Sequence, residues 1–139
     1  MKPGVLLCAA IGSLVLMAAG RAGAGEISVA SLPPVVVETT PRSGDRVVDP
    51  GLKEIRVRFS KDMLTERMWS FVQIDPASYP KTTGQPHYLK DRRSIVLPVE
   101  LAPGKAYAIW INKGQFNAFR DTGQRPAVPY LLVFETRKN

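Results

Sequence analysis

Cysteine and histidine are almost absent from this 139-residue chain, which contains one of each, Cys8 and His87. One cysteine cannot close an intrachain disulfide, and one histidine excludes the His-His and His-Cys pairs of common metal sites. A Ser-His-Asp triad finds no support beyond that single histidine, and no glycine-rich loop for a phosphate occurs. The sequence therefore predicts a protein that has no metal or cofactor and is not an enzyme.

The chain also lacks a sustained apolar stripe with a 3.6-residue period, so no long core helix is expected. No block of five or more like charges occurs either, because acidic residues lie among scattered basic ones. The net charge of +7 is therefore interpreted as a solvated surface and not as a nucleic-acid site.

The first 24 residues have the pattern of a secretory signal peptide. Lys2 supplies the positive start, residues 5–17 (VLLCAAIGSLVLM) form an apolar core, and residues 22–24 (AGA) offer a small-x-small cleavage site. A transmembrane anchor is the alternative, but the uncharged stretch 3–20 is at the short limit of the ~17–25 residues needed to span a bilayer. Cys8 follows Leu7 inside the apolar core, which argues against a lipoprotein.

Cleavage after residue 24 would remove Lys2, Arg21 and Cys8, leaving 115 residues with 17 basic and 12 acidic side chains and a net charge of +5. This length suits one small sandwich domain. We expect an exported protein, periplasmic or extracellular, that does not span the membrane once its signal is removed. The expected organisation is a signal peptide over residues 1–24, a short extended lead over 25–32 and one domain over 33–137.

Short segments that are β-branched or that alternate between apolar and polar residues follow the signal. They predict strands near residues 35–37, 55–59, 71–74, 95–99, 105–112 and 130–136. Turn residues and many prolines separate them. The sequence thus predicts an all-β antiparallel sandwich of about seven strands.

Four segments between these strands carry more specific expectations. Residues 61–68 predict a helical turn or an irregular crossover between sheets, and residues 115–120 predict one short helical turn. Residues 75–87, broken by three prolines and Gly84, predict a long loop without regular structure. Pro98 interrupts its segment and favours an edge position or a strand end, because proline donates no backbone hydrogen bond.

Several motifs, taken in order, resemble bacterial Ig-like domains of the SbsA type. They are a Pro-rich start at residues 33–36, a TPRSG turn at 40–44, the strand IRVRFSKDM at 55–63, LAPGKAY at 101–107, DTG at 121–123 and FET at 134–136. The resemblance covers residues 33–137 except for the variable middle, 68–91. It implies an Ig-like sandwich that serves as a binding module. Tyr107 is interpreted as structural, with its ring in the core and its hydroxyl on backbone at a corner.

Aromatic residues are the remaining candidates for a site. Trp110 lies between two inward-facing isoleucines, so alternation places it on the outer face, where it can stack on a sugar or anchor a protein. The candidate partner-binding residues are Trp69, Tyr79, His87, Tyr88 and Trp110. The plainer alternative for each is structural: packing against the core or the sheet for the aromatics, and a loop position for His87.

Two functions remain open at this point. The first is an exported, non-catalytic Ig-like module that binds a protein or polysaccharide at the cell envelope or outside the cell. The second is a periplasmic carrier of copper or a small ligand, because copper-binding proteins of the CopC type share a similar sandwich and Phe-Ser strand. Similarity to that family would imply a histidine at the mature N-terminus and further histidines or acids nearby, whereas this chain would begin Gly25-Glu26 and has only His87.

Overall fold

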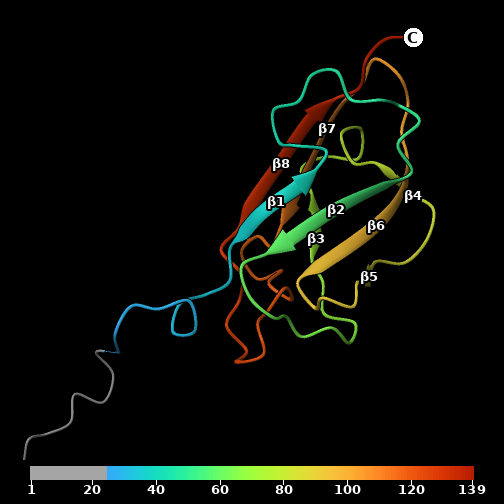
Figure 1. Ribbon diagram of the computed structural model, residues 1–139. Coiled ribbons are helices and arrows are strands. Elements are labelled where there is room, and N and C mark those ends of the chain that lie inside the picture. Colours follow the sequence, from blue (N-terminus) through green and yellow to red (C-terminus); the bar gives the residue numbers. More distant parts are fainter. Residues whose placement is uncertain (1–24) are drawn as a thin grey trace, which may run out of the picture.

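The computed structural model describes residues 25–139, and these form a sandwich of two antiparallel β-sheets with no helix among them (Figure 1). The strands are β1 (Val36–Thr40), β2 (Glu54–Phe59), β3 (Phe71–Gln73), β4 (Lys81–Thr82), β5 (His87–Tyr88), β6 (Ser94–Glu100), β7 (Ala106–Ile111) and β8 (Tyr130–Glu135). The signal-peptide prediction concerns residues 1–24, which lie outside the described residues. The described part of the chain has no helix of the length and apolarity that crossing a membrane requires.

One sheet has the order β1-β2-β6, with β4 and β5 both pairing with the far side of β6. The other sheet has the order β3-β7-β8. The predicted all-β sandwich is confirmed. Its eight strands exceed the expected seven because β4 and β5 are separate two-residue strands.

Alternation along β2 builds the core as predicted. Ile55, Val57 and Phe59 are buried, while Arg56 and Arg58 are exposed. Burial of each such apolar side chain contributes about 1.5–3 kcal/mol. The other members of the core cluster come from both sheets and from the loops: Val48, Met63, Ile95, Leu97, Val99, Leu101, Tyr107, Ile109, Ile111, Phe119, Ala127, Leu132 and Phe134.

A loop residue, Phe119, closes one end of this core. Its ring centroid lies 5.2 Å from that of Phe59 and 5.0 Å from that of Phe71. The buried Asn112 side chain donates to the carbonyls of Phe119 and Ala127 and accepts from the Phe119 N–H. One amide thus fixes the long loop between β7 and β8.

The predicted helical turn at residues 115–120 is wrong. Lys113 and Phe116 exchange backbone hydrogen bonds of 2.8 and 2.9 Å, which makes a tight turn. Gly114 and Gln115 form the tip of this turn, and residues 117–119 that follow have no regular structure. Residues 61–68 form an irregular crossover from one sheet to the other, which was one of the two alternatives predicted for them.

Pro98 does not mark an edge or a strand end, as its sequence context indicated, because β6 is an inner strand. The N–H of the next residue, Val99, donates to Lys53 on the β2 side, so the Pro98 nitrogen faces the other side. There β4 pairs with residues 99 and 100 and β5 with residues 95 and 96. On this side of β6 the partner is therefore interrupted between β4 and β5, opposite Pro98, which cannot donate a backbone hydrogen bond.

The same pairing corrects the prediction for residues 75–87. This segment is not wholly irregular, since it contains β4 and the first residue of β5. Between its prolines two short pairs of residues remain that can form strands, and the free edge of β6 provides backbone hydrogen-bond partners for them. Strand pairing with a distant segment is a tertiary effect that local composition does not reveal.

The predicted tyrosine corner is confirmed. The Tyr107 ring is buried and lies 5.3 Å from the Phe134 ring, and its hydroxyl accepts a 2.8 Å hydrogen bond from the Ala102 N–H. Gly104 supplies the turn between them with a φ of +64°, a region that residues with a Cβ enter at a cost.

Candidate functional site

Three aromatic side chains gather at one open edge of the sandwich, where the edge strands β3 and β4 of the two sheets face each other. Trp69, Phe71 and Tyr79 line a hollow of about 290 Å³ there, together with Thr82, Gly84, Gln85, Pro86 and Leu97. We call it the aromatic hollow. Its volume is at the lower end of the roughly 300–1,000 Å³ of small-molecule sites, so it has room for about one sugar ring.

Hydrogen bonding separates the tyrosines that hold the fold from the one in the hollow. The Tyr88 hydroxyl donates to the Met68 carbonyl at 2.8 Å, and Tyr107 binds backbone at its corner. Within residues 25–139 no hydrogen-bond partner engages the Tyr79 hydroxyl or the Trp69 indole N–H. These two polar groups are therefore available to a ligand.

Burial raises the pKa of the hydroxyl of Tyr79 and, more strongly, that of Tyr88. Both groups are therefore neutral near pH 7. The rings of Trp69, Phe71 and Tyr79 also pack against the core from one side. The hollow thus offers partly fixed aromatic faces and edges together with neutral polar groups.

The structure does not bring all the candidate residues together. Trp69 and Tyr79 share the aromatic hollow, and Tyr88 packs beside them against the core. His87 is exposed on the opposite side of β5. Trp110 lies on the outer face of β7, as predicted, with Lys113 Nζ at 5.2 Å from its ring centroid.

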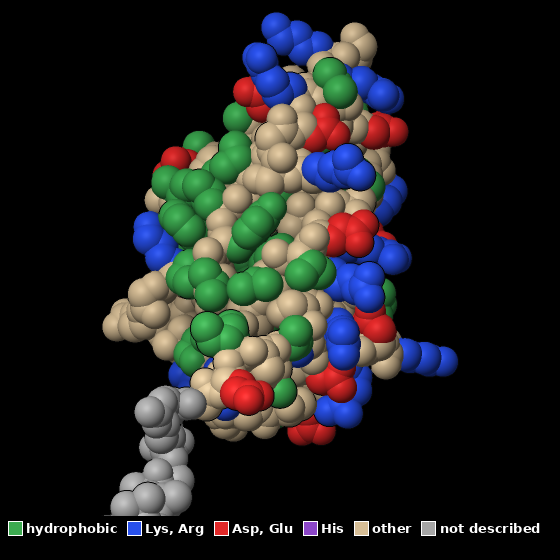
Figure 2. All heavy atoms as spheres, turned by 60° about the vertical axis from the view of Figure 1, so that its left-hand side comes forward, with side chains coloured by type: hydrophobic (Ala, Val, Ile, Leu, Met, Phe, Trp, Pro, Cys, Tyr) green, Lys and Arg blue, Asp and Glu red, His purple; other side chains and the backbone are tan. Residues whose placement is uncertain are grey.

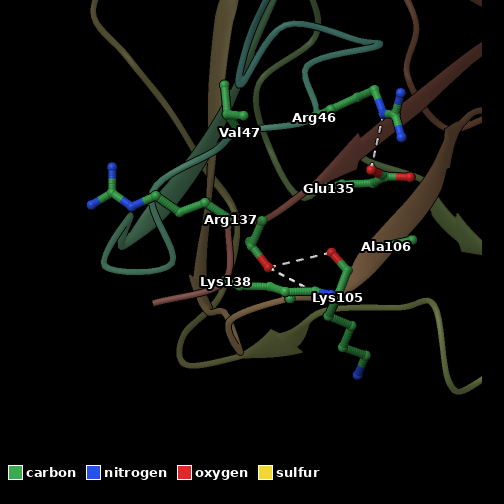
Figure 3. A pocket seen from close by; sticks show the side chains of 9 residues that line it. Arg46, Val47, Lys105, Ala106, Glu135, Arg137 and Lys138 are labelled. Carbon is green, nitrogen blue, oxygen red and sulfur yellow. Dashed lines mark hydrogen bonds and ion pairs between the residues drawn. The ribbon is translucent and has the colours of Figure 1, made fainter.

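A second hollow, of about 440 Å³, is lined mainly by basic and backbone groups near the C-terminus (Figure 3). Arg46 pairs with Glu135 at 3.3 Å, and Arg137 lies 3.5 Å from an Asp49 oxygen. Figure 3 shows Arg46 and Arg137 pointing to opposite sides, and Lys105 pointing away from both. These cations do not converge on one point, so the hollow is a poor site for a single anion.

The buried carboxylate of Asp121 serves the fold by binding neighbouring backbone groups and Lys61. Its Oδ1 accepts from the N–H groups of Gly123 and Arg125, and its Oδ2 lies 2.7 Å from Lys61 Nζ. Burial opposes its ionisation, but the bonds from Lys61 and these N–H groups outweigh that cost and lower the pKa of Asp121 below its ordinary value. Asp121 is therefore an ionised anchor and not a proton carrier.

Three further aspartates serve turns and a surface ion pair. Asp62 pairs with Arg93 at 2.9 Å, while Asp45 and Asp49 accept hydrogen bonds from nearby backbone N–H groups. Among residues 25–139 no group of three or more His, Cys, Asp or Glu side chains is placed to hold a metal ion.

The two sheets, the tyrosine corner and the order of the motifs agree with one family. A family model for bacterial Ig-like domains matches residues 30–136. The chain belongs to the bacterial Ig-like domain family. The resemblance seen in its motifs is thereby confirmed.

Two solved structures are similar to this Ig-like chain: the crystal structure of the S-layer protein rSbsC(31-844) and the structure of domains 1–6 of the surface layer protein SbsC. Each match has a TM-score of 0.49 and 17% sequence identity, and covers 79% of this chain but 14% of the other. A comparison with curated proteins finds no match.

Sequence reasoning named Trp69 and Tyr79 of the hollow, but not its third aromatic residue, Phe71, nor its non-aromatic lining. Thr82, Gly84, Gln85 and Pro86 belong to the segment predicted to be an irregular loop. A signal was present, because small and polar residues separate Tyr79 from Tyr88 at a spacing that allows the chain to turn back. The anchor pair Lys61 and Asp121 was also missed, although both residues lie within the quoted motifs.

Proposed function

We propose that this chain is an exported, non-catalytic Ig-like module that binds a polysaccharide of the cell envelope or its surroundings at the aromatic hollow. Export is supported by the signal-peptide pattern of residues 1–24. The binding role is supported by the family, although the Ig-like fold alone serves many functions. The choice of ligand rests on the chemistry of the hollow.

The observation that carries the proposal is that Trp69 and Tyr79 line the hollow and that their polar groups have no hydrogen-bond partner among residues 25–139. A pyranose ring has one face of C–H groups that packs on an aromatic side chain, and hydroxyls at its edge that need donors and acceptors. Among the residues that line the hollow, Trp69 carries an indole N–H, Tyr79 a hydroxyl and Gln85 an amide, next to aromatic rings. A purely apolar ligand would leave these groups unsatisfied at a cost.

Other candidate functions lack such a site. The carboxylates of Asp45, Asp49 and Asp62 hold turns and an ion pair, which supports a non-catalytic role. A copper carrier would need clustered ligands, which are not found among residues 25–139, and the single histidine is exposed on β5 and does not line the hollow. The proposal therefore retains the binding module and drops the carrier.

The test is calorimetric titration of the chain from Gly25 onward with two neutral oligosaccharides, cellotetraose and the N-acetylglucosamine tetramer. We expect saturable binding of at least one of them. Tyr79→Phe removes only the unpartnered hydroxyl, so it should weaken binding roughly 3- to 10-fold while the domain remains folded. Gln85→Ala should act in the same direction.

Trp110→Ala provides the matched control, because this residue lies on the outer face of the β3-β7-β8 sheet and does not line the hollow. It should leave sugar affinity unchanged. Absence of binding to both oligosaccharides, or binding that Trp110→Ala abolishes and Tyr79→Phe leaves intact, would contradict the proposed site.

A further inference from the structure

The lead, residues 25–32, is ordered by hydrogen bonds within itself. The hydroxyls of Ser28 and Ser31 each accept from the backbone N–H of the other residue at 3.0 Å, and the Ser31 hydroxyl donates to the Glu26 carbonyl at 2.8 Å. The Leu32 N–H donates to the Ser28 carbonyl at 3.2 Å. Much of the backbone of this short segment is thus hydrogen-bonded inside the protein.

Two cations fasten the lead to the sandwich. Lys61 Nζ donates to the carbonyls of Ala30 and Leu32 at 3.0 Å, and Arg125 donates to the Ala30 carbonyl at the same distance. Lys61 also pairs with the buried carboxylate of Asp121. The lead is therefore held against the domain by side chains of two separate loops.

This ordered segment exposes aliphatic side chains. Ile27 is 86% exposed and Val29 is 68% exposed, while Leu32, Val35 and Val128 are 40–48% exposed. These five side chains line a mainly apolar hollow of about 460 Å³, and we call them the aliphatic patch. Since exposed apolar surface costs free energy in water, a patch of this kind held in a fixed arrangement marks an interaction surface.

The figures show where the patch lies. The lead projects beside the start of β1 (Figure 1). In Figure 2, which brings that side of the molecule forward, hydrophobic side chains gather on one side, and Lys, Arg, Asp and Glu line the opposite margin. The apolar surface of the domain therefore continues from the sandwich towards the lead.

The loops at this end of the sandwich carry an excess of basic residues. The crossover 61–68 donates backbone hydrogen bonds to the loops 89–93 and 113–128. With the lead, these loops contain eight basic and five acidic residues: Lys61, Arg67, Lys90, Arg92, Arg93, Lys113, Arg120 and Arg125 against Glu26, Asp62, Glu66, Asp91 and Asp121. Some of them pair with each other, but this end keeps +3 of the net +5 carried from Gly25 onward.

We propose that the aliphatic patch docks on an anionic lipid bilayer, with Ile27, Val29 and Leu32 among the acyl chains and the basic loops at the headgroups. The position of the patch in the chain favours this occupant. Ile27 follows the apolar stretch 5–17 by ten residues, and a stretch of that kind enters a membrane both as a signal and as an anchor. The patch would keep the exported domain at the membrane after cleavage.

The hydrogen bonds and the charge of this end also suit a bilayer. Backbone groups without partners are costly among acyl chains, and Ser28, Ser31, Lys61 and Arg125 supply partners for those of the lead. Anionic headgroups attract the basic balance of the loops. A second copy of the chain would instead bring two positive ends together.

Co-sedimentation of the chain from Gly25 onward with vesicles tests the proposal. We expect binding to vesicles of equal parts phosphatidylglycerol and phosphatidylcholine, weaker binding to phosphatidylcholine alone, and weaker binding in about 1 M NaCl, where charges are screened. Ile27→Ser and Val29→Ser should each reduce affinity for the mixed vesicles roughly tenfold, because an aliphatic side chain no longer leaves water. Val47→Ser, a matched change at an exposed valine outside the patch, should leave it unchanged.

A fluorescent label tests insertion itself. The chain from Gly25 onward has no cysteine, so Ile27→Cys and Val47→Cys each offer one thiol for a polarity-sensitive dye. Mixed vesicles should shift the emission of the dye at residue 27 to shorter wavelength and leave that at residue 47 unchanged.

No binding to the mixed vesicles, or binding that Ile27→Ser and Val29→Ser leave intact, would overturn the proposal. Self-association through the patch in place of vesicle binding would also overturn it and would assign the patch to a second copy. The aromatic hollow does not include these residues, so Ile27→Ser should leave oligosaccharide binding unchanged. Failure of one proposal is therefore distinguishable from failure of the other.

Discussion

Lys61 Nζ lies 2.7 Å from Asp121 Oδ2, and both side chains are largely shielded from solvent, with exposed fractions of 13% and 0%. The same ammonium donates to the carbonyls of Ala30 and Leu32 at 3.0 Å. It therefore joins the lead, the crossover after β2 and the loop before β8. Met63, two residues after Lys61, also forms a β-bridge with Asp121.

Asp121→Asn should lower the free energy of unfolding by about 3 kcal/mol, because it leaves the shielded Lys61 ammonium without its anion. Thermal and denaturant unfolding of the two proteins measures the difference. Glu100→Gln is the matched control, since the Lys81–Glu100 pair is largely exposed at both ends and should contribute at most about 1 kcal/mol. Equal effects of the two changes would contradict the anchoring role of Asp121.

Acid should remove the same contribution. The pKa of Asp121 is lowered in the folded protein, so its stabilisation is fully present above the unfolded value of about 3.9. It is lost as the pH falls through the lower folded pKa. The stability difference between the wild type and Asp121→Asn should thus be constant above about pH 5 and shrink below pH 4. A stability difference that grows as the pH falls would contradict the lowered pKa of Asp121 in the folded protein.

Tyr107→Phe should destabilise the domain by about 1–2 kcal/mol, because the part-buried Ala102 N–H loses its acceptor. Tyr130→Phe is the control, since this ring also packs on the core but its hydroxyl forms no hydrogen bond within residues 25–139. It should change stability by less than about 0.5 kcal/mol. If both variants have the same free energy of unfolding as the wild type, the corner hydrogen bond contributes nothing to stability.

Tyr79 and Tyr88 should respond in opposite ways to loss of the hydroxyl. Tyr88→Phe removes the bond to the Met68 carbonyl and should cost about 1 kcal/mol of stability. Tyr79→Phe should leave stability unchanged and weaken oligosaccharide binding. Parallel denaturation and titration of both variants checks this crossed pattern. A Tyr79→Phe protein that is as destabilised as Tyr88→Phe would mean that the Tyr79 hydroxyl serves the fold.

The strands that alternate strictly were predictable, because one buried face imposes a two-residue period on residues such as Ile55, Val57 and Phe59. Their pairing order was not. Pro98 indicated an edge because its local chemistry is that of an edge, yet a divided partner strand lets it lie inside the sheet. Long-range pairing of this kind is not encoded in the neighbouring residues.

The candidate site was partly predictable for a related reason. The sequence pointed to the aromatics because their number exceeds what a small core requires, and alternation placed Trp110 on the outer face. Only the structure shows that Trp69 and Tyr79 share one hollow while Trp110 lies elsewhere. Their separation in space depends on how the two sheets stack.

The most direct measurement uses the two tryptophans of the chain, which give two indole N–H signals in a proton–nitrogen correlation spectrum. Trp69→Phe and Trp110→Phe assign them. Titration with the N-acetylglucosamine tetramer and with cellotetraose is predicted to shift the Trp69 signal, in the aromatic hollow, and to leave the Trp110 signal in place. A shift confined to Trp110, or no shift of either signal with both sugars, would contradict the account.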